Sequence, residues 1–223
     1  MRQSMLVAVL ATAFTLYACG GGGGGTAPPP GPTSTPNPQA HLYEPLATGD
    51  SWSYSCQDIK GGGENGGQPF TITDSVGPTT TVNGQTVYEF SLQIPQVPSS
   101  PLSIATQIQL LANDSHGNVT LYGYLVNGSV VGVTPTLFVS ANPSLQNASF
   151  NYTAPNGSTI IRTFAGFFPT HPTKLGTFPS VADYEEGAGA MNNYGYAPGV
   201  GIAEEDHGPN NEVDCLITAF TLH

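Results

Sequence analysis

Short stretches of alternating apolar and polar residues recur along residues 41–223, and they predict β-strands. In residues 51–58, Trp52, Tyr54 and Cys56 alternate with serine and other polar residues, so these three side chains would share one face of a strand. No stretch of the chain combines helical spacing with capping residues over three turns or more. Residues 70–74 and 215–222 also read as strands. Residues 103–111 could form a short helix, but their neighbours favour a strand.

Three Asn-Gly pairs, each flanked by β-forming residues, predict tight hairpins over residues 79–92, 119–133 and 149–164. Short hairpins join antiparallel neighbours. About ten strands need curvature or closure to hide their edges. We therefore expect a mainly β domain built on a single antiparallel curved sheet or partial barrel, with a β-sandwich as the alternative.

The N-terminal residues predict export. Residues 5–17 are uncharged and mostly apolar, but they fall short of the about 20 residues that a membrane-spanning helix needs. Their length fits the apolar core of a signal peptide. An ordinary secretory signal cut near Ala18 is one interpretation of this segment.

Leu16-Tyr17-Ala18-Cys19 resembles the lipobox of bacterial lipoproteins. The resemblance implies that residues 1–18 are a lipoprotein signal peptide and that Cys19 is the site of lipidation. Acyl chains on Cys19 would then anchor the protein to a membrane. Gly20 follows the cysteine in place of an Asp, and in this family that implies the outer membrane, with the domain facing the periplasm or the cell surface.

Residues 19–40 predict a disordered tether between the lipid anchor and the domain. Six glycines occupy residues 20–25, and six prolines follow within residues 26–39. The first part is a flexible coil, and the second is an extended spacer. Residues 41–223 remain, and their length suits one domain with a core of its own.

Charge restricts the classes of partner. The chain has 15 acidic and 4 basic residues, a net charge of −11, and only 9% of its residues are charged. Binding along a nucleic-acid backbone needs clustered Lys and Arg, so we expect no nucleic-acid partner. Attachment to a membrane would depend on the acyl chains and not on a basic patch.

Two cysteines remain once Cys19 is assigned to lipidation. Exported proteins fold in an oxidising compartment, so Cys56 and Cys215 are expected to form a disulfide between the first and last strands. The alternative is a pair of buried free thiols.

Three motifs of the domain resemble a group of bacterial lipoproteins and secreted domains. They read YxPLxxGxxWxY from Tyr43, GTFxxVxxYxE from Gly176 and YAPGVG from Tyr196. The resemblance implies a shared β fold and no particular activity. The aromatic residues near these motifs have two interpretations: a structural corner that closes one end of a barrel, or an aromatic-lined mouth that admits a ligand. The residues that would line such a mouth are Trp52, Tyr54, Phe164, Phe167, Phe168, Tyr194 and Tyr196.

Residues 183–214 contain eight acidic residues and no Lys or Arg. Glu204, Asp206 and His207 are weak candidates for metal ligands, because carboxylate and imidazole groups bind cations. Their spacing matches no known metal-binding loop, and neighbouring residues on a strand point to opposite faces. We therefore expect a solvated acidic segment and no metal or other cofactor.

The sequence carries no recognisable catalytic motif; G-x-S-x-G and H-E-x-x-H are both absent. The favoured hypothesis is a lipid-anchored envelope lipoprotein whose non-catalytic β-domain acts through contacts with an envelope protein partner. The alternative is a periplasmic carrier that holds a lipid or other apolar ligand on the concave face of the sheet. A hydrolase is a third hypothesis, for which no catalytic residue is assigned.

Overall fold

The computed structural model describes residues 43–58, 68–96, 103–144, 149–187, 192–208 and 212–223. The expectations for the signal peptide, for lipidation at Cys19, for the tether of residues 19–40 and for the domain boundary at residue 41 lie outside the described residues.

Every regular element among the described residues is a β-strand, and none of these residues belongs to a helix long and apolar enough to cross a lipid bilayer. The strands are β1 (Ser51–Asp58), β2 (Phe70–Val82), β3 (Gln85–Gln96), β4 (Ser103–Asn113), β5 (Val119–Val126), β6 (Ser129–Val139), β7 (Ser149–Thr153), β8 (Thr159–Thr173), β9 (Gly176–Glu186), β10 (Asn192–Ala197), β11 (Gly201–His207) and β12 (Val213–Thr221).

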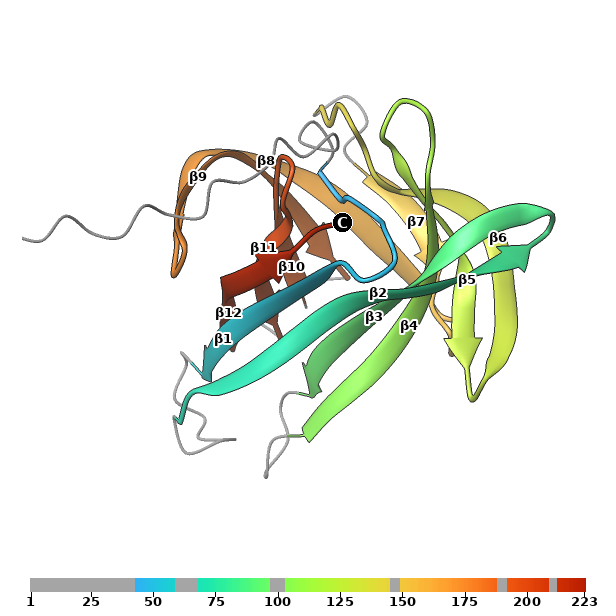
Figure 1. Cartoon of the computed structure of the whole chain (residues 1–223), viewed down its shortest axis with the longest axis horizontal. Helices are drawn as coiled ribbons and strands as arrows, with labels where there is room; N and C mark the ends of the chain where they lie inside the picture. Colours follow the sequence, from blue (N-terminus) through green and yellow to red (C-terminus); the bar gives the residue numbers. More distant parts are fainter. Residues whose placement is uncertain (1–42, 59–67, 97–102, 145–148, 188–191, 209–211) are drawn as a thin grey trace, which may run out of the picture. The chain divides into compact units, whose positions relative to one another are not determined.

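These strands form one antiparallel sheet in the order β6-β5-β4-β3-β2-β1-β12-β11-β10-β9-β8-β7. The sheet curls until its two edge strands lie next to each other (Figure 1). Side chains join these edges, since the rings of Phe138 on β6 and Tyr152 on β7 are 5.7 Å apart. The prediction of a single curved antiparallel sheet is confirmed, in the form of a nearly closed barrel, and the β-sandwich alternative is wrong.

The local turn chemistry explains the hairpins. Asn83 and Gly84 both have positive φ, at 52° and 81°, and Asn127 and Gly128 at 51° and 76°, as type I′ turns require. The hairpin between β7 and β8 is present, but its turn is longer. There Gly157 has a φ of 84°, and the Asn156 Oδ1 accepts a hydrogen bond from the Ser158 backbone N–H at 3.0 Å.

The first and last strands are neighbours, as the cysteines predicted. Cys56 and Cys215 are direct register partners on β1 and β12, and a disulfide joins them. Both side chains are fully buried. The disulfide therefore closes a loop with a sequence separation of 159 residues at the middle of the sheet.

The segment between β10 and β11 is a structural corner. The Trp52 indole N–H donates to the Val200 carbonyl, and the Tyr54 hydroxyl donates to the Ile202 carbonyl at 3.1 Å. Gly201 has a φ of +98°, and a Cβ there would lie 2.9 Å from the Trp52 Nε1. Only glycine tolerates both that backbone conformation and that close approach. For Trp52 and Tyr54, the corner interpretation therefore describes the structure.

Candidate functional site

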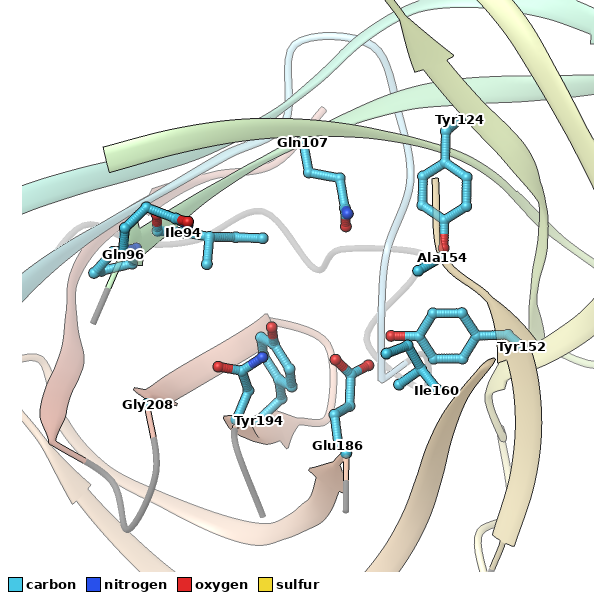
Figure 2. Close-up of a pocket in the computed structure, with 13 residues that line it drawn as sticks. Ile94, Gln96, Gln107, Tyr124, Tyr152, Ala154, Ile160, Glu186, Tyr194 and Gly208 are labelled. Carbon is cyan, nitrogen blue, oxygen red and sulfur yellow. The ribbon is translucent and has the colours of Figure 1, made fainter. Parts of the chain in front are cut away.

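A cavity of about 280 Å³ opens at one end of the barrel. It lies where β3, β5, β7, β9 and β11 end and where β4, β8 and β10 begin. We call it the end cavity. Its volume is at the lower limit of the roughly 300–1,000 Å³ typical of small-molecule sites. Six side chains define its character (Figure 2): Gln107, Tyr124, Tyr152, Ile160, Glu186 and Tyr194.

A buried ion pair includes Glu186 of the end cavity. Arg162 on β8 lies directly opposite Glu186 on β9 in the sheet register. The Arg162 Nη1 donates to the Glu186 Oε1, and the Arg162 Nη2 donates to the Tyr196 hydroxyl at 2.6 Å. Arg162 is fully buried, so these bonds replace the water that its charge would otherwise require.

Aromatic rings surround the Arg162 guanidinium. Its central carbon lies 4.2 Å from the ring centroid of Phe138, 4.9 Å from that of Tyr184, 5.2 Å from that of Tyr194 and 5.3 Å from that of Tyr196. Distances within about 6 Å favour cation–π attraction. The interior of the barrel therefore stabilises a cation with a carboxylate, a phenol and several ring faces.

Two tyrosine hydroxyls give the end cavity its hydrogen-bonding capacity. The Tyr152 hydroxyl interacts with the Glu186 carboxylate. The Tyr124 hydroxyl is buried and has no hydrogen-bond partner among the described residues. Burial raises the pKa of both phenols, so both remain neutral and able to donate or accept at neutral pH.

A second group of ionisable side chains, which we call the inner acid group, lies deeper in the barrel. It consists of Asp74, Glu205 and His207, all fully buried. The Glu205 Oε2 lies 3.0 Å from the His207 Nε2, and the Asp74 and Glu205 carboxyls share a side-chain hydrogen bond. Burial raises the pKa of Glu205 to about 7 and lowers that of His207 to about 4.

Glu44 is a further buried carboxyl, and neither of its oxygens has a hydrogen-bond partner among the described residues. It lines a small void of about 10 Å³ together with Gln109 and Arg162. A void of this size has room for about one water molecule. Burial raises the pKa of Glu44 well above its ordinary value.

The outer face of β11 and β12 carries a separate acidic cluster, which we call the outer acid group. Oxygens of Glu204, Asp206 and Asp214 lie within 4.8 Å of one another, and the His171 Nε2 lies 2.9 Å from the Glu204 Oε2. All four side chains are half-buried. Burial, followed by the charges of Glu204 and Asp214, raises the pKa of Asp206 to about 7.

The structure divides the weak metal candidates. Glu204 and Asp206 belong to the outer acid group, whereas His207 points into the barrel with Glu205. His207 lies apart from Glu204 and Asp206 because residues 204–207 belong to β11 and successive side chains of a strand alternate between its faces. Asp214 takes its place near the two carboxylates.

The predicted aromatic liners have three different positions. Tyr194 lines the end cavity. Phe167 and Phe168 are 47% and 41% exposed, so they lie on the surface of the barrel. The remaining four are buried in the packed core: Trp52, Tyr54, Phe164 and Tyr196. Side chains thus fill most of the space that an apolar ligand would need.

Sequence reasoning missed Asp74, Arg162 and Glu186. One signal was available for Arg162, because it alternates with Ile160 and Phe164 on a predicted strand, which places an arginine on an otherwise apolar face. Asp74 carries the same signal, because it alternates with Phe70 and Ile72 on a predicted strand. The partners of Asp74 and Glu186 depend on how the strands pair, which the local pattern does not determine.

No protein-family model matches the chain, and no curated protein matches it. Two solved structures resemble it. One is provisionally described as an exported protein with a YmcC-like fold from Bacteroides fragilis, with a TM-score of 0.40 and 13% identity over 81% of this chain and 99% of that chain. The other is provisionally described as a lipoprotein from Parabacteroides distasonis, with a TM-score of 0.38 and 14% identity over 81% of this chain and 98% of that chain. Similarities of this size carry no argument about activity or ligand.

Proposed function

We propose that the chain is a lipid-anchored protein of the bacterial cell envelope and that its β-domain is a non-catalytic binding module. The end cavity holds a small polar ligand. One observation carries this proposal: a cavity of about 280 Å³ remains at one end of a barrel that is otherwise filled with side chains.

The lining of the end cavity favours a polar ligand over a lipid. An acyl chain would cover the Glu186 carboxylate and the Tyr124 hydroxyl without offering either a hydrogen bond. Burying an unsatisfied polar group costs about 1–3 kcal/mol. A ligand with its own donors avoids that cost, so this proposal replaces the apolar carrier with a binder of small polar molecules.

Lipid anchoring rests on the sequence motif at Cys19 and has its own test. Replacing Cys19 with Ala removes the thiol that receives the lipid. The variant is expected to move from the membrane fraction to the soluble fraction of an exporting bacterium, and its mass is expected to lose the acyl increment. If the variant stays in the membrane with an unchanged mass, the anchoring part of the proposal is wrong.

Ligand binding is tested by blocking the end cavity. Ala154 lines it and contributes only its backbone to the loop hydrogen bonds, so Ala154→Trp fills the cavity without breaking them. Thr153→Trp is the matched control, because Thr153 is the adjacent residue and is exposed. The full chain, purified in detergent, is incubated with the low-mass fraction of a cell extract and weighed by native mass spectrometry.

We expect a small bound mass on the wild type and on Thr153→Trp, and none on Ala154→Trp. An unliganded wild type, or an equal bound mass on Ala154→Trp, contradicts binding in the end cavity.

A further inference from the structure

Glu186 is the charged side chain of the end cavity. The other described residues that line it are uncharged, and the chain has only four Lys and Arg residues. Within the described part of the chain these are Arg162, whose charge is already paired with Glu186, and the exposed Lys174. Among the described residues that line the cavity, an anionic ligand would therefore meet a carboxylate and no free cation.

Arg162 shows which chemistry this part of the barrel stabilises. Its guanidinium is bound by the Glu186 carboxylate, and its carbon lies 5.2 Å from the Tyr194 ring centroid. Glu186 and Tyr194 also line the end cavity. Glu186 and Tyr194, which contact the Arg162 guanidinium inside the barrel, can therefore also contact a ligand in the end cavity.

Tyr124 supplies an unused hydrogen-bonding group. Its side chain is 1% exposed, and its hydroxyl has no partner among the described residues. The hydroxyl points toward the space between Ala154 and Tyr152 (Figure 2). Native structures rarely leave a buried hydroxyl unsatisfied, so a ligand group placed beside it would complete its hydrogen bonding.

We propose that the ligand of the end cavity is a small alkylamine, bound through a protonated primary amino group. The proposal rests on the binding function given above. The ammonium N–H groups donate to the Glu186 carboxylate and to the Tyr124 hydroxyl oxygen. The methylenes of the ligand pack against the tyrosine rings and Ile160.

Isothermal titration calorimetry on the full chain in detergent tests the class of ligand. Putrescine is the probe, 1,4-butanediol is its uncharged analogue, and glucose represents larger polyols. We expect putrescine to bind about tenfold more tightly than the diol, because a hydrogen bond to a charged group is roughly twice as strong as a neutral one. Equal or tighter binding of the diol or of glucose overturns the proposal.

Two variants locate the interaction without removing the partner of Arg162. Tyr124→Phe deletes only the unpartnered hydroxyl, and we expect it to weaken putrescine binding about 3- to 10-fold. Tyr122→Phe is the matched control on the same strand; Tyr122 packs against a separate apolar cluster away from the end cavity. Equal effects of the two variants contradict the proposal.

Gln107→Glu is a gain-of-function variant. The Gln107 Oε1 accepts a hydrogen bond from the Gln109 Nε2 at 3.1 Å, and a glutamate keeps that acceptor while adding a second carboxylate. We expect about tenfold tighter binding of putrescine and no change for the diol. Unchanged putrescine affinity argues against the proposal.

The two proposals fail in different ways. A neutral molecule found by native mass spectrometry, and lost in Ala154→Trp, refutes the alkylamine and leaves the binding function standing. If the wild type retains no mass and Gln107→Glu binds none of the three probes, both proposals are wrong.

Discussion

Strand β11 presents acidic residues to two different environments. Glu205 and His207 point into the barrel and are fully buried, whereas Glu204 and Asp206 are half-buried on its outer face. Burial is the first cause of the raised pKa on both sides, about 7 for Glu205 and about 7 for Asp206. The second cause differs. For Asp206 it is repulsion from Glu204 and Asp214, whereas for Glu205 it is a hydrogen bond with Asp74 that opposes the shift, ahead of repulsion from Glu44 and Glu186.

This difference shows that similar pKa values can rest on different physics. The inner side chains depend on specific partners that exclude water, so their effect on stability is large and insensitive to salt. The outer side chains depend partly on mutual repulsion, which mobile ions screen. The two faces of β11 can therefore be compared by removing single side chains and by changing the salt concentration.

The largest effect is expected on the inner face, at Arg162. Replacing Arg162 with Met keeps most of its length but leaves Glu186 buried without its cation. Removing one partner of a buried ion pair costs about 3–5 kcal/mol, and we expect a fall of that size in the free energy of unfolding measured by urea titration. Lys174→Met is the control, since it removes a charge from an exposed position and is expected to cost less than about 0.5 kcal/mol. Similar losses in the two variants would show that the buried pair has no special role.

The sequence alone predicted the features that depend on few residues, namely the hairpin turns and the disulfide. Two hairpin turns were predictable because each depends on one Asn-Gly pair, such as Asn83-Gly84. The disulfide was predictable because the assignment of Cys19 to lipidation left only Cys56 and Cys215 to pair. These features are decided by neighbouring residues or by elimination.

One physical reason explains why neither the contacts of the inner acid group nor the end cavity could be predicted from the sequence. Asp74 meets Glu205 only because the sheet curls and brings β2 near β11 across the interior. Barrel curvature depends on the pairing of all the strands and on the bulges within them. The opposite directions of Glu205 and Asp206 follow from strand alternation, but which face is buried depends on that curvature.

A smaller change in the free energy of unfolding is expected when the pH is raised, and the buried and half-buried carboxyls of β11 change it in the same direction. A carboxyl whose pKa is raised by folding binds more protons in the folded state, so stability falls as pH rises through the folded-state pKa. Glu205 and Asp206, with pKa values of about 7, predict a loss of roughly 1–2 kcal/mol between about pH 6.5 and pH 8. Folding lowers the pKa of His207 from about 6.5 to about 4, so His207 acts in the opposite direction, mainly below this window.

Urea titrations at the two pH values measure this loss. Glu205→Gln keeps an acceptor for His207 and removes the titrating group, so we expect it to reduce the pH dependence by about half. A wild type whose stability is constant or rises over this window would contradict the raised pKa values.

The smallest effect is expected on the outer face and depends on salt. Asp206 and Asp214 are direct register partners, and like charges opposite each other destabilise a sheet. Asp206→Asn is therefore expected to stabilise the protein by about 0.5 kcal/mol near pH 8 at low ionic strength. At about 0.5 M salt, screening over a few ångströms should remove most of this gain. The change in unfolding free energy caused by Glu205→Gln should be the same at both salt concentrations, because a fully buried carboxylate is screened much less. If salt changes both variants equally, the two faces of β11 do not differ in the way that their contacts indicate.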